Sequence, residues 1–225
     1  MYKYETHCHT KEVSKCSHIT AEDLVKFYKN QGFDGVFITD HFFNGNTTVD
    51  RNQSWEKMVD DFCIGYENAK IAGEKLGIDV FFGFEYSYHG TDVLVYGLDK
   101  QWLLAHSDIM KLGTTDFCDF ARKEGALVIH AHPYREASYI NMIRLFPRNV
   151  DGVEIYNACR TDFENARAKE YADNYELFYS AGTDNHVGMR ESLGGMEFDE
   201  KIKSEADFVQ KMKAQKGRIF RMDLE

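Results

Sequence analysis

The chain has 225 residues, a net charge of −10 from 27 basic and 37 acidic side chains, and 43% hydrophobic residues. This composition is typical of a globular domain, and the excess of acidic over basic side chains argues against a long nucleic acid as partner. No run of about 18 apolar residues is present, and the first residues lack the apolar stretch of a secretory signal. We therefore expect a cytoplasmic protein without a membrane span, folded as one domain over residues 1–225.

The cysteine pattern points to reduced thiols. Five cysteines are widely spaced and include no C-x-x-C pair, which argues against a disulfide framework and against a zinc finger. They are Cys8, Cys16, Cys63, Cys118 and Cys159.

Short apolar runs rich in β-forming residues predict seven buried strands. In chain order they cover residues 3–7, 35–41, 79–87, 92–98, 126–132, 151–157 and 177–184. Helical patterns occupy residues 20–32, 54–77, 115–125, 136–146, 161–174 and 204–217. The first of these helices has Thr20 as its predicted N-terminal cap. Strands that alternate with helices predict an α/β fold with parallel pairing, and seven strands favour a closed barrel. The link between the third and fourth runs is too short for a crossover helix, so we expect a hairpin there.

Polar side chains follow nearly every predicted strand at its carboxyl end. They are His7, His9, Asp40, His41, Glu85, His130, His132, Glu154, Asp184 and His186. In parallel α/β folds the carboxyl ends of the strands share one face, and that face carries the active site. We therefore expect these side chains to converge.

Three of the pairs are separated by one residue: His7 with His9, His130 with His132, and Asp184 with His186. Side chains at i and i+2 of a strand point to the same side, so each pair can direct two donors at one place. Imidazole and carboxylate suit zinc, manganese and iron, and more than four such groups are too many for one tetrahedral ion. The sequence therefore predicts a cluster of two or three divalent metal ions. His89 is a candidate for the mouth of the site, and Cys8 is expected in the core.

Five motifs together resemble the PHP (polymerase and histidinol phosphatase) domain family. They are HCHT at 7–10, ITDH at 38–41, GFE at 83–85, AHPYR at 131–135 and GTDNH at 182–186. They occur in the family's order between about residues 4 and 198. The resemblance implies a distorted seven-stranded (β/α)7 TIM-like barrel with a two- or three-metal centre that hydrolyses phosphoesters.

The resemblance also implies roles for individual residues. The metal ligands would be His7, His9, His41, Glu85, His132, Asp184 and His186. Asp40 and His130 would orient the ligands or contact the substrate. For a third ion, the family's usual Asp or His after the first motif is missing, so Glu12 is the preferred ligand here and Cys16 the alternative. Asp92 stands where many members have a histidine on the fourth strand.

The expected reaction is attack on phosphorus by a hydroxide held between two metal ions. Asp184, His130 and Asp40 form the predicted catalytic set; His130 or a metal-bound water would protonate the leaving group. Arg135 and Arg160 are the predicted phosphate ligands. The expected substrate is a small phosphorylated metabolite or nucleotide, and a histidinol-phosphatase-like enzyme is one version of this hypothesis.

Two alternatives remain open at this point. One is an amidohydrolase-type barrel, which also opens with H-x-H but is usually longer and often has a bridging lysine at a strand end. The other is a metal-binding PHP module without catalysis. The sequence does not indicate the oligomeric state.

Overall fold

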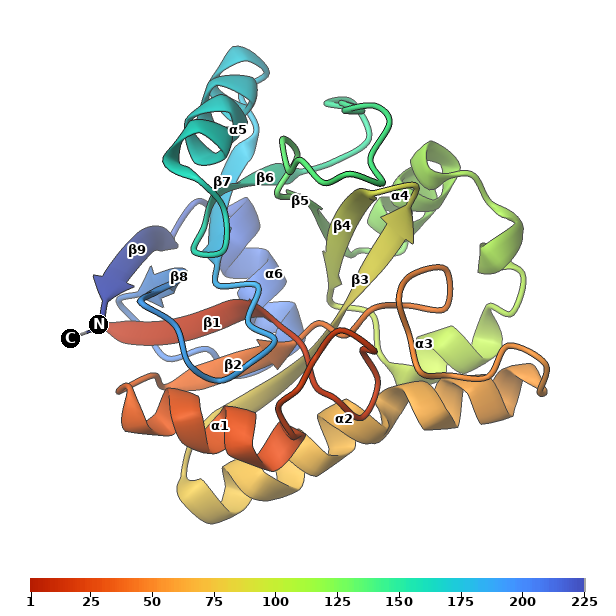
Figure 1. Cartoon of the computed structure of the whole chain (residues 1–225), viewed down its shortest axis with the longest axis horizontal. Coiled ribbons are helices and arrows are strands. Elements are labelled where there is room, and N and C mark those ends of the chain that lie inside the picture. Colours follow the sequence, from red (N-terminus) through yellow and green to blue (C-terminus); the bar gives the residue numbers. More distant parts are fainter. Residues whose placement is uncertain (225) are drawn as a thin grey trace.

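A mixed β-sheet of nine strands curls into a nearly closed barrel in the computed structural model, which describes residues 1–224 (Figure 1). The strands are β1 (Tyr2–Cys8), β2 (Gly35–Ile38), β3 (Asp79–Tyr88), β4 (Thr91–Tyr96), β5 (Leu127–Ala131), β6 (Gly152–Asn157), β7 (Phe178–Gly182), β8 (Ser192–Phe198) and β9 (Arg218–Asp223). Their order in the sheet is β7-β6-β5-β4-β3-β2-β1-β8-β9. The seven strands predicted from the sequence thus follow one another around the barrel. The α/β barrel is confirmed, with two strands more than expected.

The predicted hairpin is confirmed as the main departure from parallel pairing. Strand β4 runs antiparallel to both β3 and β5, whereas β1, β2 and β3 are parallel, as are β5, β6 and β7. The turn between β3 and β4 uses positive φ angles, 49° at His89 and 81° at Gly90. Because β4 is reversed, its first residues lie at the end of the barrel where the parallel strands finish. Asp92 pairs there with Ser87 and with Ala131.

The barrel closes between β1 and β7. The Thr6 hydroxyl donates a hydrogen bond of 2.6 Å to the Ala181 carbonyl. The Asp184 amide donates one of 2.7 Å to the His7 carbonyl. Strands β8 and β9 extend the sheet beyond β1 in antiparallel pairs. The seam therefore brings the first and last polar motifs side by side.

Helices cover the outside of the barrel. They are α1 (Ala21–Asn30), α2 (Trp55–Leu76), α3 (Lys100–Ala105), α4 (Thr114–Lys123), α5 (Asp162–Asn174) and α6 (Glu205–Lys213), with a short 3-10 helix η1 (Ile109–Lys111). Figure 1 shows α1 and α2 along the outer side of β1 and β2, and α5 outside β6 and β7. Thr20 caps α1 as predicted, since its hydroxyl accepts from the Asp23 amide. Within residues 1–224, none of these helices combines the length and apolar composition needed to cross a bilayer.

The predicted helix over residues 136–146 is wrong. This segment has no regular secondary structure. Its apolar side chains at Tyr139, Met142 and Ile143 are 63%, 60% and 40% exposed. With these three side chains exposed, the segment buries little of the apolar face that a helix would present, and short helices gain most of their stability from such packing.

Helix α6 closes the amino-terminal end of the barrel. The ring of Phe208 lies 4.3 Å from that of Phe37 and 5.1 Å from that of Tyr96, measured between centroids. Lys213 donates a hydrogen bond of 2.8 Å to the carbonyl of Ala126, just before β5 begins. The barrel interior is therefore apolar at this end, and the polar residues are concentrated at the other.

Candidate metal centre

Seven side chains meet at the carboxyl end of the barrel. His7 and His9 come from the end of β1, His41 follows β2, Glu85 lies on β3, His132 follows β5, and Asp184 and His186 follow β7. They form three overlapping groups that could each hold an ion. The groups are His9, His41 and His186; His7, Glu85 and His132; and His7, His9 and Asp184. All seven metal ligands implied by the family resemblance are thus brought together.

Two carboxylates join the inner part of this cluster. The Oε1 atom of Glu85 lies 3.2 Å from His132 Nε2 and 3.5 Å from His7 Nε2. The Oδ1 atom of Asp184 lies 3.5 Å from His7 Nε2 and 3.3 Å from His9 Nε2. Each carboxylate thus lies within 4 Å of more than one histidine, which suits a ligand shared between neighbouring ions.

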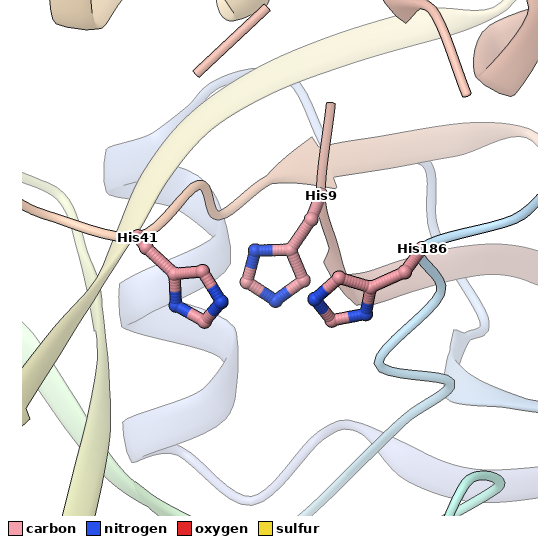
Figure 2. Close-up of side chains that lie close together, drawn as sticks. All are labelled: His9, His41 and His186. Atoms are coloured by element: carbon pink, nitrogen blue, oxygen red, sulfur yellow. The ribbon is translucent and has the colours of Figure 1, made fainter. Parts of the chain in front are cut away.

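The outer part of the cluster consists of three histidine rings side by side (Figure 2). The ring centroid of His9 lies 4.4 Å from that of His41 and 4.2 Å from that of His186. His41 Nδ1 also lies 2.6 Å from Glu85 Oε2, which links the outer group to the inner one. On the other side of the ring, the Cys16 sulfur lies 3.1 Å from His41 Nε2.

The cluster contains buried polar atoms that lack hydrogen-bond partners among residues 1–224. They are His7 Nε2 and His9 Nε2, together with His41 Nδ1 and Glu85 Oε2, which lie 2.6 Å apart but without the geometry of a hydrogen bond. Buried polar atoms are nearly always paired in native structures, and leaving one unpaired costs about 1–3 kcal/mol. Imidazole nitrogens and carboxylate oxygens that converge without partners fit divalent ions such as zinc, manganese or iron.

The pKa shifts in the cluster favour the ligating protonation state for one histidine and both carboxylates. Burial, together with the nearby His186 and His41, holds the pKa of His9 well below its usual value, so this ring stays neutral. Burial alone would raise the pKa of Glu85 and of Asp184. The neighbouring histidines outweigh burial and hold both pKa values well below the usual range. Metal ligands must be neutral imidazoles and ionised carboxylates, a state that His9, Glu85 and Asp184 already favour. Against the effect of burial, nearby carboxylates and the Cys16 thiol raise the pKa of three other rings, so an ion that binds there would displace protons. These rings are His7, His41 and His186.

Glu154 on β6 orients two of the ligands. Its carboxylate accepts from His7 Nδ1 at 2.9 Å and from the His132 amide at 3.0 Å. With Nδ1 engaged in this way, Nε2 of His7 faces the cluster. Carboxylates commonly position metal-binding histidines like this. The sequence placed Glu154 at a strand end but gave no sign of this role, which depends on a neighbour 147 residues away.

Asp40 acts on the cluster through Ser14. Its carboxylate accepts from the Thr10 amide and from the Ser14 hydroxyl, each at 2.7 Å. The Ser14 oxygen lies 3.3 Å from His9 Nδ1. Helix α2 packs closely here because it has Gly65, where a Cβ atom would come within 2.5 Å of Asp40 Oδ2. This placement fits the predicted orienting role of Asp40 and keeps its carboxylate behind the ligands.

Glu12 does not join the cluster. Both of its carboxylate oxygens accept from the Ala21 amide, at 3.0 and 3.1 Å, at the beginning of α1. Amides at a helix N-terminus lack partners within the helix and attract negative charge, so the nearby helix provides a better site for this carboxylate. The prediction that Glu12 ligates a third ion is therefore corrected.

His130 points away from the cluster. Its ring stacks on Phe146 at 4.5 Å and meets the edge of Tyr171 at 5.7 Å, on the outer side of β5. His132 instead lies beyond the end of β5 with φ of 27°, so the chain has left the regular alternation before this residue. The expected pairing of His130 with His132 is therefore wrong, and His130 is not placed to protonate a leaving group.

An open cavity of about 750 Å³ lies over the outer part of the cluster. Its wall includes Arg135, Arg160 and Arg190. The Nε atoms of Arg160 and Arg190 are buried without a hydrogen-bond partner in the described part of the chain. The sequence singled out Arg135 and Arg160; Arg190 was missed, because no pattern distinguishes it from a surface arginine.

Asp92 also lines this cavity rather than joining one of the three ligand groups. Its Oδ2 atom lies 3.7 Å from Nη1 of Arg135. The guanidinium of Arg135 in turn lies 5.5 Å from the ring centroid of Tyr139. The structure thus gives Asp92 an arginine partner at the position where we expected a metal ligand.

The model of the PHP domain family matches residues 5–220 of this chain. The chain belongs to this family. Comparison with curated proteins gives no significant match. The PHP domain match extends over the whole metal cluster and the barrel that carries it.

Solved structures resemble this PHP domain at low sequence identity. A two-domain protein from Bacteroides vulgatus, described as containing a predicted PHP-like metal-dependent phosphoesterase, has 15% identity and a TM-score of 0.68. The match covers 97% of this chain and 64% of that protein, so this PHP domain spans less than two thirds of it. PsfC from Pseudomonas syringae has 15% identity and a TM-score of 0.62, with 99% and 91% of the two chains covered.

An amidohydrolase from Chromobacterium violaceum, solved with bound sulfate and no metal, also shares the fold. It has 15% identity and a TM-score of 0.52, with 82% of this chain and 87% of that chain covered. At these identities the likeness shows the fold alone.

Proposed function

We propose that this PHP domain is a metal-dependent phosphatase or phosphodiesterase that acts on a small phosphorylated metabolite or nucleotide. One observation carries the proposal: a cluster of histidines and carboxylates faces a cavity whose wall includes three arginines. The first feature provides ligands for cations, and the second provides donors for an anion.

The seven clustered side chains would hold two or three divalent ions, with zinc, manganese or iron as the candidates. Bound ions of this kind lower the pKa of water and offset the charge that develops on phosphate oxygens. Glu154 keeps Nε2 of His7 directed at the cluster, and the Asp40–Ser14 pair supports His9. These contacts hold the ligands in place before any ion arrives.

Arg135, Arg160 and Arg190 would bind the phosphate oxygens. The guanidinium group matches phosphate in geometry and stays charged at all relevant pH values. The net charge of −10 would repel an anion from the molecule as a whole. The local arginines and the bound cations would reverse that sign inside the cavity, whose volume of about 750 Å³ suits a small ester.

Since His130 faces outward, the proton for the leaving group must come from elsewhere. The cavity wall includes His89 and Asp92, which lie outside the three ligand groups. Burial, with the nearby Glu85, raises the pKa of Asp92, although Arg135 at 3.7 Å opposes this shift. We therefore assign the proton to Asp92, His89 or solvent water.

The test is metal-dependent phosphate release. The purified chain is stripped with a chelator, reloaded with zinc, manganese, iron or cobalt, and assayed on a panel of phosphomonoesters and phosphodiesters. We expect activity only in the reloaded protein. Arg190→Met should raise KM about 10- to 100-fold, as expected for the loss of a charge-assisted hydrogen bond.

The matched control is Arg167→Met, because Arg167 lies on α5 and pairs with Glu170 at the surface. Its KM should remain that of the unmodified protein. Turnover of amide or carboxylic ester substrates instead of phosphoesters would support the amidohydrolase alternative. Metal binding without turnover of any substrate would support a non-catalytic module.

A further inference from the structure

Cys16 is held next to the outer histidines by the loop between β1 and α1. The loop is fixed to the same segments that supply these ligands. The Ser17 hydroxyl donates to the His9 carbonyl at 2.9 Å, and the His18 amide donates to the His186 carbonyl at 2.8 Å. The Cys16 sulfur lines the cavity and lies 3.1 Å from His41 Nε2.

A second observation points to a ligand at this place. His9 Nε2 is completely buried and has no hydrogen-bond partner among the residues that the structure describes. It lies in the group that His9 forms with His41 and His186. Three imidazoles alone leave one position of a tetrahedral ion open, and the Cys16 sulfur lies within reach, 3.1 Å from His41 Nε2.

We propose that Cys16 binds, as a thiolate, the ion held by His9, His41 and His186. The inference rests on the metal centre of the proposed function and specifies its outer position. As the sulfur–metal bond forms, the S–H bond breaks and its proton passes to solvent, while the imidazoles bind in their neutral form.

This ligand would make the two parts of the cluster chemically different. Thiolate is a soft donor that selects zinc or iron over manganese and magnesium, whereas carboxylates accept the harder ions. The outer position has one sulfur and three nitrogens, while the inner groups contain Glu85 and Asp184. We therefore expect the outer position to prefer zinc and the inner positions to be less selective.

Cobalt provides a readout that does not depend on activity. The metal-free protein is loaded with cobalt(II), and its near-ultraviolet spectrum is examined for a thiolate-to-cobalt charge-transfer band. We expect the band in the unmodified protein and in Cys159→Ser, and its loss in Cys16→Ser. Cys159 is the matched control because it lines the same cavity but donates its thiol hydrogen to the Asp184 carbonyl at 3.3 Å.

Metal content and affinity give a second measurement. Cys16→Ser should lose zinc affinity at the outer position by more than the roughly 10- to 100-fold that an outer hydrogen-bond partner contributes. Cys16→Asp restores an anionic donor, so it should keep the ion, lack the band and shift the zinc-to-manganese preference toward manganese. Circular dichroism is used to check that each variant is folded.

The outcomes separate this inference from the proposed function. An active unmodified protein without the band, or a band that persists in Cys16→Ser, would overturn the thiolate ligand and leave the phosphoesterase standing. A band that depends on Cys16, in a protein that releases no phosphate from any substrate, would overturn the function and leave the ligand.

Discussion

At one end of the barrel, helix α6 packs Phe208 against Phe37 and Tyr96, whereas at the other end histidines and carboxylates form a cluster beside a cavity. The first end is filled by apolar contacts that stabilise the fold without a ligand. The second contains buried atoms whose hydrogen-bonding capacity is unused within residues 1–224. One end of the barrel thus contributes mainly to the stability of the fold, and the other provides the candidate metal ligands. Variants at the two ends should therefore change the free energy of unfolding and the metal affinity separately.

The largest effect should come from the apolar end. Phe208→Ala removes a completely buried ring and should lower the free energy of unfolding by about 3–5 kcal/mol. Urea unfolding measures this loss, and metal affinity of the folded fraction should remain unchanged. Phe163→Ala is the control, since that ring is 68% exposed and its loss should change stability by no more than about 0.5 kcal/mol. A large loss of metal binding in folded Phe208→Ala would show that the two ends are coupled.

Asp184→Asn should have the next largest effect, on activity. It removes the charge that faces His7 and His9 while keeping the size of the side chain. We expect kcat to fall roughly 10²- to 10³-fold, the range for losing one group that stabilises transition-state charge. Phosphate release and metal content of the purified variant measure the effect. Exposed Glu74→Gln is the control, and full activity in Asp184→Asn would contradict the proposed site.

Glu154→Gln tests whether the hydrogen bonds that orient His7 and His132 contribute to metal affinity. An amide offers one oxygen where the carboxylate serves both His7 Nδ1 and the His132 amide. Metal affinity should fall about 10- to 100-fold, as is usual when a ligand loses its orienting partner. Competition with a chromogenic chelator measures it. An unchanged affinity would mean that His7 is positioned by other contacts.

His130→Phe should alter acid stability rather than turnover. Burial, with a smaller contribution from His132, lowers the pKa of His130 from 6.5 to about 3. The neutral ring therefore contributes stability that is fully present above pH 6.5 and is lost progressively as the pH falls toward 3. From pH 7 to pH 5 this loss should reach about 2 kcal/mol, and the phenylalanine variant should be spared it.

Urea unfolding of both proteins at pH 7 and at pH 5 measures that difference. If the gap between the two proteins stays constant with pH, or if His130→Phe loses turnover, His130 has a role that its outward position does not explain.

Most of the metal cluster could be predicted because strand ends converge in a parallel barrel. His7, His41, Glu85 and Asp184 lie where their positions at the ends of apolar runs placed them. The wrong predictions share one cause: a local sequence pattern does not indicate which residues from other parts of the chain will lie next to it. The i, i+2 rule placed His130 beside His132, but φ of 27° at His132 ends the alternation.

Competition from neighbouring elements explains the other errors. Glu12 has the right charge for a metal ligand. Its carboxylate instead accepts a hydrogen bond from the Ala21 amide, which has no partner within its own helix. Strand β8 was missed because Gly194 and Gly195 break its apolar pattern. A Cβ atom at Gly195 would come within 2.4 Å of the Tyr4 carbonyl, so these glycines allow the strand to pack against its neighbour. Residues 136–146 have helical spacing, but Tyr139, Met142 and Ile143 stay largely exposed.

The seam between β1 and β7 has a consequence for the order of folding. Strands β3 and β4 form a hairpin whose contacts are close in sequence, and such contacts form early. The hydrogen bond from Thr6 to Ala181 joins residues 175 positions apart, so we expect it to form late. His7 and Asp184 lie directly beside that bond, and an ion can bind both of them only once β1 and β7 have met. Metal uptake should therefore report the last step of folding.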